Sequence, residues 1–235
     1  MITLNSLINE KFINIFTDAS IYNLKVGGKV QEVIGCPGYI VVHGDKIIDQ
    51  GYTLLRHSTN NISELYAILL GVTTAKYYKD YTIRLFSDSQ LSIFAIRDRI
   101  FNWIRKSDGN TLYTVEGTPV SNQSYIMNIV YTILNNGVKI DLYHQKGHVN
   151  TSKDSDILNA KEVFKVSNRL QNNVIDDNFI IAISNYNNYV DNMTRDNLHR
   201  HISHIESIGT TEPFEFVYKP FEIQKYKELI YKGGK

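Results

Sequence analysis

The order of strand-like and helix-like segments in the first 150 residues places the tightest limit on the fold of this chain. Three β-rich runs come first: FINIFT at residues 12–17, and two runs within residues 38–55 around the hairpin signal HGDK. Strands joined by such short links pair antiparallel to each other. The Gly-containing stretch at residues 23–38, between the first two runs, is typical of a long loop or of a hairpin.

Helical spacing follows at residues 58–78, where the apolar positions are Leu65, Ile68, Leu69, Val72 and Ala75. A fourth strand, YTIRLF, is predicted at residues 81–86. Two helical stretches at residues 89–107 and 121–136 then lead to a fifth β-rich run at residues 138–145. Strands that return through helices lie parallel to the first. The sequence therefore predicts an α/β fold in which helices flank a mixed five-stranded sheet, with the first three strands antiparallel.

The pattern weakens after residue 149. Residues 150–187 are polar and irregular, with one helix expected at residues 157–170, and a further helix is expected at residues 188–205. Residues 205–235 are aromatic and end in the basic run KGGK. We therefore expect one domain over residues 1–204 and a C-terminal extension over residues 205–235.

Composition limits the compartment and the partners. The chain has 235 residues and a net charge of +1, so binding of nucleic acid would have to rest on a local basic patch. The single cysteine, Cys36, cannot form an internal disulfide, which favours a reducing compartment. We find no signal peptide and no apolar stretch long enough to span a membrane. An intracellular, cytoplasmic location is expected, or the host cytoplasm for a viral protein.

Three carboxylates occupy element ends that the predicted sheet brings together. Asp18 ends the first strand, Asp88 follows the fourth strand, and Glu64 lies in the first turn of the first helix. Like charges at such distances require protonation or a cation, and oxygen ligands suit Mg²⁺ or Mn²⁺. Two such ions about 3.5–4 Å apart form the clamp used for phosphoryl transfer. An Asp at a strand-to-helix junction is also a common helix N-cap, and this alternative applies to Asp88.

Five segments in order carry a resemblance to a known family: FTDAS, STNNISELYAILLGV, LFSDSQLSI, YHQKGHVN and NNYVDNMTR. They resemble the motifs of type 1 ribonuclease H over residues 12–149 and 186–200. The resemblance implies a ribonuclease H-like fold and an endoribonuclease that hydrolyses the RNA strand of RNA–DNA hybrids. It implies two Mg²⁺ ions per site, for which Mn²⁺ can substitute, and products with 3′-hydroxyl and 5′-phosphate ends.

The same resemblance assigns the catalytic residues Asp18, Glu64, Asp88, His148 and Asp191. The four carboxylates match the family's metal ligands, and Asn188 stands three residues before Asp191. His148 matches a histidine that assists proton transfer or product release. The alternatives are a helix-start residue for Asp191 and an ordinary loop residue for His148.

The resemblance also assigns contacts to the hybrid. Thr59, Asn60 and Asn61 match a segment that reads the minor groove, and amide side chains suit 2′-hydroxyls and base edges. Further contacts are implied for Ser89 and Gln90 and for a basic protrusion that holds the DNA strand: Arg97, Arg99, Phe101, Trp103, Arg105 and Lys106. The alternatives are a polar loop that caps a helix and an amphipathic helix with a solvated face.

Two features depart from the family pattern. His148 and Asp191 are farther apart than usual, which marks residues 150–187 as an insertion, and the C-terminal extension is additional. Protein partners could bind through either segment. A catalytically degenerate module that binds hybrids or acts as a scaffold is therefore the alternative function.

Other two-metal nucleases with this sheet fit less well. Proofreading exonucleases carry a second carboxylate two residues after the first, where this chain has Ser20. Integrases and related transposases need a glutamate near residues 121–125, which read SNQSY and contain no acid.

Overall fold

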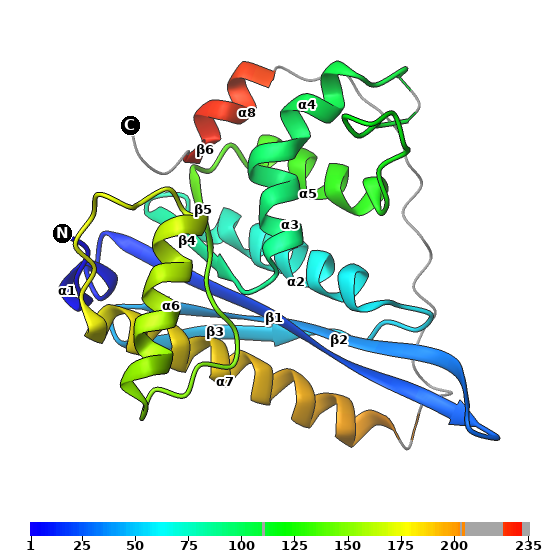
Figure 1. Ribbon diagram of the computed structural model, residues 1–235, viewed down its shortest axis with the longest axis horizontal. Helices are drawn as coiled ribbons and strands as arrows, with labels where there is room; N and C mark the ends of the chain where they lie inside the picture. The colour runs from blue at the N-terminus through cyan, green and yellow to red at the C-terminus, as the bar shows by residue number, and fades with distance from the viewer. Residues whose placement is uncertain (110, 203, 205–222, 232–235) are drawn as a thin grey trace.

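The structure is a computed structural model, and it describes residues 1–109, 111–202, 204 and 223–231 (Figure 1). Its centre is one sheet with the strand order β3-β2-β1-β4-β5-β6. The strands are β1 Phe12–Val26, β2 Lys29–His43, β3 Lys46–Tyr52, β4 Thr82–Ser87, β5 Ile140–His144 and β6 Ile230–Tyr231. The sheet runs through the middle of the molecule with helices on both faces.

The predicted five-stranded sheet is confirmed. Strands β1, β2 and β3 pair antiparallel, whereas β4 pairs parallel to β1 and β5 pairs parallel to β4. A short sixth strand, β6, adds to β5 in parallel. The hairpin reading of residues 23–38 is correct, because β1 and β2 are 15 residues each and meet at Gly27 and Gly28, both with positive φ.

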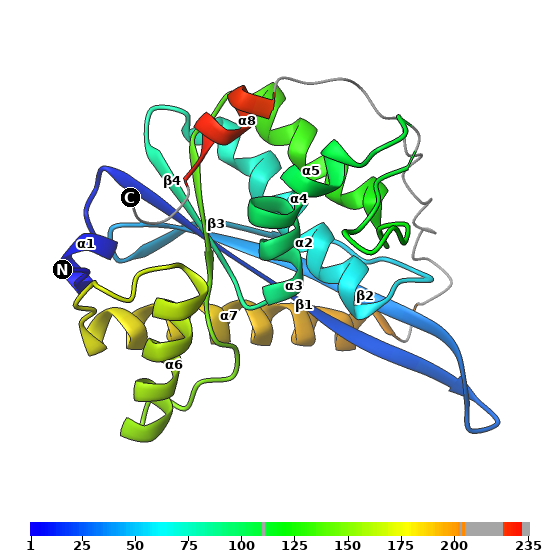
Figure 2. The same ribbon diagram turned by 45° about the horizontal axis from the view of Figure 1, so that its top comes forward.

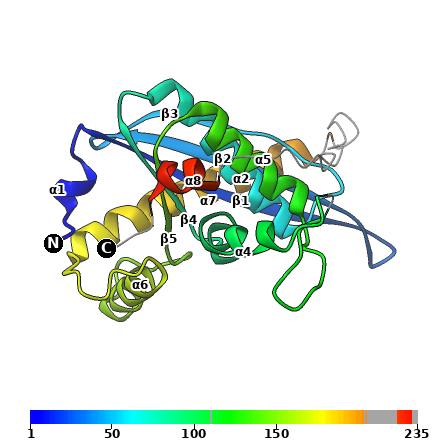
Figure 3. The same cartoon turned by 90° about the horizontal axis from the view of Figure 1, so that it is seen from above.

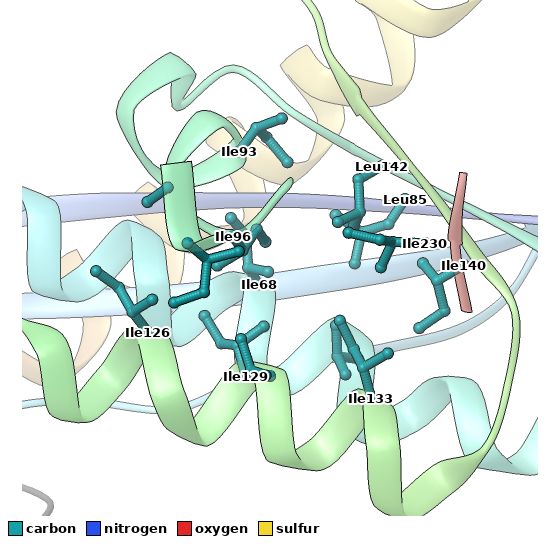
Figure 4. Packing of buried hydrophobic residues seen from close by; sticks show 14 of the residues in the cluster. Ile68, Leu85, Ile93, Ile96, Ile126, Ile129, Ile133, Ile140, Leu142 and Ile230 are labelled. Atoms are coloured by element: carbon teal, nitrogen blue, oxygen red, sulfur yellow. The ribbon is translucent and has the colours of Figure 1, made fainter. Parts of the chain in front are cut away.

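One face of the sheet is covered by most of the helices, as Figures 1 and 2 show. The helices on this face are α2 Asn60–Ala75, α3 Gln90–Phe94, the π-helical turn η2 Ala95–Arg99, α4 Ile100–Arg105, α5 Gln123–Asn136 and α8 Ile223–Leu229. The short 3₁₀ turn η1 Lys76–Tyr78 follows α2. Figure 3 views the molecule from the side of α5 and α8. Isoleucine and leucine side chains fill the space between them and the strands (Figure 4). Burial of this apolar surface is the main stabilising term for the layer.

The opposite face is covered by α7 Asp177–His201, α6 Asp154–Ser167 and the short α1 Leu4–Leu7, which share a second apolar cluster. Aromatic rings stack within it: Phe16 on β1 and Phe86 on β4 have ring centroids 4.8 Å apart. The alternation of side chains along β1 separates the two clusters, since Ile15 faces α2 and Phe16 faces α7.

The predicted helices at residues 58–78 and 121–136 are confirmed as α2 and α5. The helix expected at residues 157–170 is α6, which begins earlier, at Asp154. The helix expected from residue 188 is α7, which begins at Asp177, so residues 177–187 are helical rather than irregular. The helix begins there because the Asp176 side chain accepts a hydrogen bond from the Asn178 N–H. Its end was expected at residue 205, which lies outside the described residues.

Part of the C-terminal extension packs onto the domain. Tyr226 of α8 is fully buried, and its hydroxyl donates to the Ile96 carbonyl at 2.8 Å. The centroid of its ring lies 5.9 Å from that of the Phe101 ring. Ile230 of β6 belongs to the apolar cluster between the sheet and α2, which we call the α2-side core. Residues 205–222 and 232–235 of the extension lie outside the described part of the chain.

None of the helices that the structure describes combines the length and the hydropathy that a bilayer crossing requires.

Candidate active site

Asp18 and Asp88 emerge side by side because of the register of β1 and β4. Thr17 pairs with Ser87 in the parallel ladder, and each aspartate is the next residue in its strand direction. Asp18 is 8% exposed, and one of its oxygens accepts a hydrogen bond from the Ala19 N–H at 2.7 Å. The N-cap of α3 is Ser89, whose hydroxyl accepts from the Ser92 N–H, so helix capping does not explain Asp88.

Glu64 reaches the same place from α2. Thr59 caps that helix by accepting from the Ile62 N–H at 3.2 Å, and Glu64 lies one turn inside. The Asn60 amide donates to Oε1 of Glu64 at 2.6 Å, and the Ser89 hydroxyl donates to Oε2. Ser89, the residue after Asp88 in the chain, therefore holds Glu64 through a side chain that is itself buried.

Asp191 lies in the middle of α7, so it is not a helix-start residue. The helix approaches the sheet closely beside Asp18, because Asp18 pairs with Gly38 and a Cβ at Gly38 would lie 2.7 Å from Thr194. One carboxylate oxygen of Asp191 is 3.3 Å from Nη1 of Arg195 and 3.9 Å from Nδ1 of His148. The His148 side chain is exposed.

The carboxylates act on one another electrostatically. Burial raises the pKa of Asp18 well above its ordinary value, and repulsion by Asp88, Asp191 and Glu64 raises it further, while the hydrogen bond from the Ala19 N–H opposes the shift. Burial also raises the pKa of Asp88, the hydrogen bond from Asn187 opposes this, and Glu64 adds to it. All four predicted carboxylates therefore lie in one region, brought there by β1, α2, the end of β4 and α7.

The side chains do not form a ready metal cage. Within the described ranges, no three His, Cys, Asp or Glu side chains lie close enough together to hold a metal ion as they stand. Each carboxylate accepts a hydrogen bond or pairs with a nearby donor. The donors are the Ala19 N–H, Asn60, Ser89, Asn187 and Arg195.

The residues nevertheless suit a hard divalent cation. The oxygens of four carboxylates are the ligands that Mg²⁺ prefers. Asp18 is buried and Asp88 is half-buried, both are held against their mutual repulsion, and a cation would relieve that repulsion. Gly147 also leaves room for Asp88, because a Cβ at Gly147 would lie 2.3 Å from its Oδ2.

Sequence reasoning missed one residue at this site, Asn187. Its amide donates to Oδ2 of Asp88 at 3.3 Å and accepts from Nε2 of Gln145 at 2.7 Å. Both amide side chains are 2% exposed. Asn188, the asparagine of the motif, instead donates to the Val149 carbonyl at 3.3 Å. The helical spacing of Ile183, Asn187 and Val190, which places all three on the buried side of α7, is the signal that would have identified Asn187.

Some of the predicted hybrid contacts are exposed side chains, whereas one is buried and already bonded within the protein. Thr59, Asn60, Asn61 and Gln90 are exposed beside the carboxylates. Thr59 also caps α2, so its two expected roles are compatible. Ser89 is buried and bonded to Glu64, which makes it a support for that carboxylate in the structure as it stands.

The basic protrusion is only partly on the surface. Arg97 is 4% exposed, and its guanidinium donates to the carbonyls of Leu142 and Ser167, so the prediction that it faces the DNA is wrong. Arg97 instead ties η2 to β5 and to the end of α6. Arg99, Arg105 and Lys106 are exposed.

The aromatic residues of this segment are largely internal. Phe101 and Trp103 belong to the α2-side core. One side of Trp103 lines a pocket of about 250 Å³ together with Asn61 and Arg99. The pocket therefore joins three of the predicted contacts, at the start of α2, at the end of η2 and on α4.

The comparisons with known proteins agree with this arrangement. The sequence profile of the RNase H family matches residues 10–198. A search of curated proteins returns no match.

Several solved structures are similar to the chain. A foamy viral protease–reverse transcriptase in complex with an RNA/DNA hybrid is 15% identical over 71% of this chain and 21% of its own, with a TM-score of 0.49. The PFV RNase H domain is 14% identical over 70% and 96%, with a TM-score of 0.49. RNase H1 from the halophilic archaeon Halobacterium salinarum NRC-1 is 17% identical over 57% and 86%, with a TM-score of 0.40.

The chain spans about a fifth of the length of the foamy viral protein that it matches. The family profile, by contrast, covers most of this chain and includes Asp18, Glu64, Asp88, His148 and Asp191. The protein therefore belongs to the RNase H family.

Proposed function

We propose that this protein is a ribonuclease H that hydrolyses the RNA strand of RNA–DNA hybrids with two divalent metal ions and leaves 3′-hydroxyl and 5′-phosphate ends. The observation that carries the proposal is the convergence of four carboxylates from separate elements on one region, where buried Asp18 and half-buried Asp88 are held against mutual repulsion. Bringing like charges together away from water raises the free energy of the folded state, so such clusters usually bind a cation or serve in catalysis.

Each residue has a part in the proposed mechanism. Asp18, Glu64, Asp88 and Asp191 would hold Mg²⁺, or Mn²⁺ in its place; the metal, when bound, stabilises charge on the phosphate and prepares a water nucleophile. His148 is exposed beside Asp191, where an imidazole can carry a proton to or from the leaving group. Asn60 and Asn61 lie at the rim and supply donors and acceptors for the minor groove.

A direct assay tests the proposal. The RNA strand of a hybrid is end-labelled and incubated with the protein and Mg²⁺, and the products are separated on a gel. We expect internal cuts whose upstream fragments a polymerase can extend, as a 3′-hydroxyl requires. An RNA–RNA duplex and a reaction with EDTA serve as controls, and both should stay intact.

The alternative function is a degenerate module that binds hybrids or acts as a scaffold without cutting them. One observation favours it: no ready group of metal ligands exists among the residues that the structure describes. It predicts tight binding of the hybrid and no cleavage with Mg²⁺ or Mn²⁺ at any concentration, an outcome that would refute the nuclease proposal.

Asn187 offers a test of how Asp88 is held. Replacing Asn187 by leucine keeps the size of the side chain but removes the donor to Asp88 and the acceptor for Gln145. We expect the Mg²⁺ concentration for half-maximal cleavage to rise about 10–100-fold, the usual effect of losing a partner of a metal ligand. Asn197→Leu is the matched control, because within the described residues the hydrogen bond of the Asn197 amide goes only to the Met193 carbonyl of its own helix. Equal metal dependence in both variants would show that Asn187 has no such role.

A further inference from the structure

The hairpin of β1 and β2 extends well beyond the rest of the sheet. β1 pairs with β4 only as far as Thr17, and β2 pairs with β3 only from Gly38 onward. Beyond these positions the two strands pair with each other as far as Val26 and Lys29. We call residues 21–34 the arm. Figures 1 and 2 show its tip beyond the ends of α2 and α7.

The exposed charge of the arm is entirely positive. Lys25 and Lys29 flank the tip and are exposed, and neither has a carboxylate partner among the described residues. The arm has one acid, Glu32, which is 8% exposed. Arg56 donates to both Glu32 oxygens at 2.7 and 2.8 Å, so the acid is neutralised at the base and does not offset the lysines.

The arm is continuous with the site described above. Its strand β1 carries Asp18, and the Ser58 N–H donates to the Val33 carbonyl at 2.9 Å, which fixes the start of α2 against the arm. Thr59, Asn60 and Asn61 follow directly, so the predicted minor-groove contacts border its base. Exposed apolar side chains lie at both ends of the arm: Ile21 at its base is 38% exposed, and Val30 near its tip is 51% exposed.

Its reach matches several base pairs of a duplex. Lys25 lies seven positions after Asp18 in β1. A strand rise of about 3.4 Å per residue then places their backbones roughly 24 Å apart. At about 3.4 Å per base pair, this distance corresponds to roughly seven base pairs. A hybrid cut at Asp18 and Asp88 can meet the lysines only if its duplex continues that far.

We propose that the arm is a second contact for the nucleic-acid duplex, in which Lys25 and Lys29 pair with backbone phosphates about seven base pairs from the cleaved phosphate. This inference rests on the proposed function for the position of the cleaved bond. The chemistry is backbone recognition, because lysine ammonium groups pair with phosphates without regard to sequence. The exposed Ile21 and Val30 add apolar contact with the sugars.

The test compares hybrids of two lengths, about 6 base pairs, closed by a loop so that the short duplex stays paired, and about 30 base pairs, since only the longer one spans the roughly seven base pairs to the arm. Binding of labelled hybrids is measured by fluorescence anisotropy in EDTA, so no cleavage is needed. The variant is Lys25→Ala with Lys29→Ala. The matched control is Lys46→Ala, an exposed lysine that begins β3 and pairs with His43, at the end of β2 opposite the arm.

For the long hybrid, we expect the double variant to bind roughly tenfold more weakly, and the slope of log affinity against log salt to fall by about two. For the short hybrid, wild type and double variant should bind equally. The control variant Lys46→Ala should bind both the long and the short hybrid with wild-type affinity. With Mg²⁺, the double variant should show a higher KM on the long hybrid and an unchanged kcat.

Three outcomes would overturn the inference: no change on the long hybrid, an equal loss on both lengths, or a change in oligomeric mass by light scattering with no change in affinity. The last would assign the arm to contacts between copies of the chain. A wild-type protein that binds the long hybrid through the lysines but never cuts it would refute the proposed function and leave the arm inference standing.

Discussion

Replacing Asp88 by asparagine is expected to reduce cleavage of an RNA–DNA hybrid by at least about a thousandfold. Metal-assisted charge stabilisation is worth several kcal/mol, and each 1.4 kcal/mol or so corresponds to a factor of ten in rate. Asparagine keeps an oxygen that can accept from Asn187, so the local hydrogen bonds survive the change. Cleavage is measured in Mg²⁺ under single-turnover conditions, with the fold checked by circular dichroism.

The same variant should be more stable than wild type when no metal is present. Burial is the main cause that raises the pKa of Asp88 in the folded protein above the ordinary value of an aspartate. Between the unfolded and folded pKa values the native state binds more protons than the unfolded state, so stability falls as pH rises through this window. Asparagine cannot ionise and escapes this loss. The difference in unfolding free energy between Asp88→Asn and wild type should therefore grow as the pH rises above the ordinary pKa of an aspartate, and it should level off once Asp88 of the folded wild type is ionised.

Mg²⁺ should reverse the order of stability. A ligand that binds only the native state stabilises it, by about 2.7 kcal/mol at one hundred times its dissociation constant. Wild type should gain this stabilisation and Asp88→Asn should gain little. The control is Asp196→Asn, which changes an exposed aspartate on α7. A variant that cuts at the wild-type rate, or that shows the same pH dependence of stability, would remove Asp88 from the proposed site.

Replacing Tyr226 by alanine is expected to give the largest loss of stability, about 3–5 kcal/mol. The side chain is fully buried between α4 and α5 and its hydroxyl bonds to the Ile96 carbonyl. Its removal leaves a cavity and an unpaired carbonyl, and it detaches α8 and β6 from the edge of the sheet. Chemical denaturation followed by circular dichroism measures the change.

Two companion variants make the result specific to packing. Tyr226→Phe keeps the ring and loses one hydrogen bond, which costs about 1 kcal/mol. Tyr77→Ala alters a tyrosine that is 73% exposed, and it should change stability by less than about 0.5 kcal/mol. Unfolding curves for Tyr226→Ala that coincide with wild type would show that the C-terminal segment does not pack onto the domain.

The parts of this fold that local sequence predicts are those set by periodicity. The apolar spacing of α2 and the alternation in β1 to β5 identify the elements, and short links identify the antiparallel strands. The convergence of Asp18 with Asp88 follows from the same logic, because both end parallel neighbours.

What the sequence could not predict depends on tertiary packing. Arg97 looks like a surface cation beside Arg99, yet it is buried because the carbonyls of Leu142 and Ser167 satisfy its donors. β6 is only two residues long and forms because Tyr226 and Ile230 find a core to enter. Asn187 and Asn188 are chemically identical, and only the side of α7 that meets the sheet distinguishes them.

The pairing of β6 with β5 also has a consequence for synthesis on the ribosome. Ile140 and its partner Ile230 are separated by the whole of α6 and α7, so the first residues of β5 lack their β6 partner while the later segments are still being translated, although Arg97, made earlier, can already donate to the Leu142 carbonyl. Chains fold from the N-terminus as they emerge, and a bare strand edge recruits other chains. Aggregation of nascent protein during overproduction should therefore start at β5, and slower translation at low temperature should not prevent it unless a chaperone shields that edge.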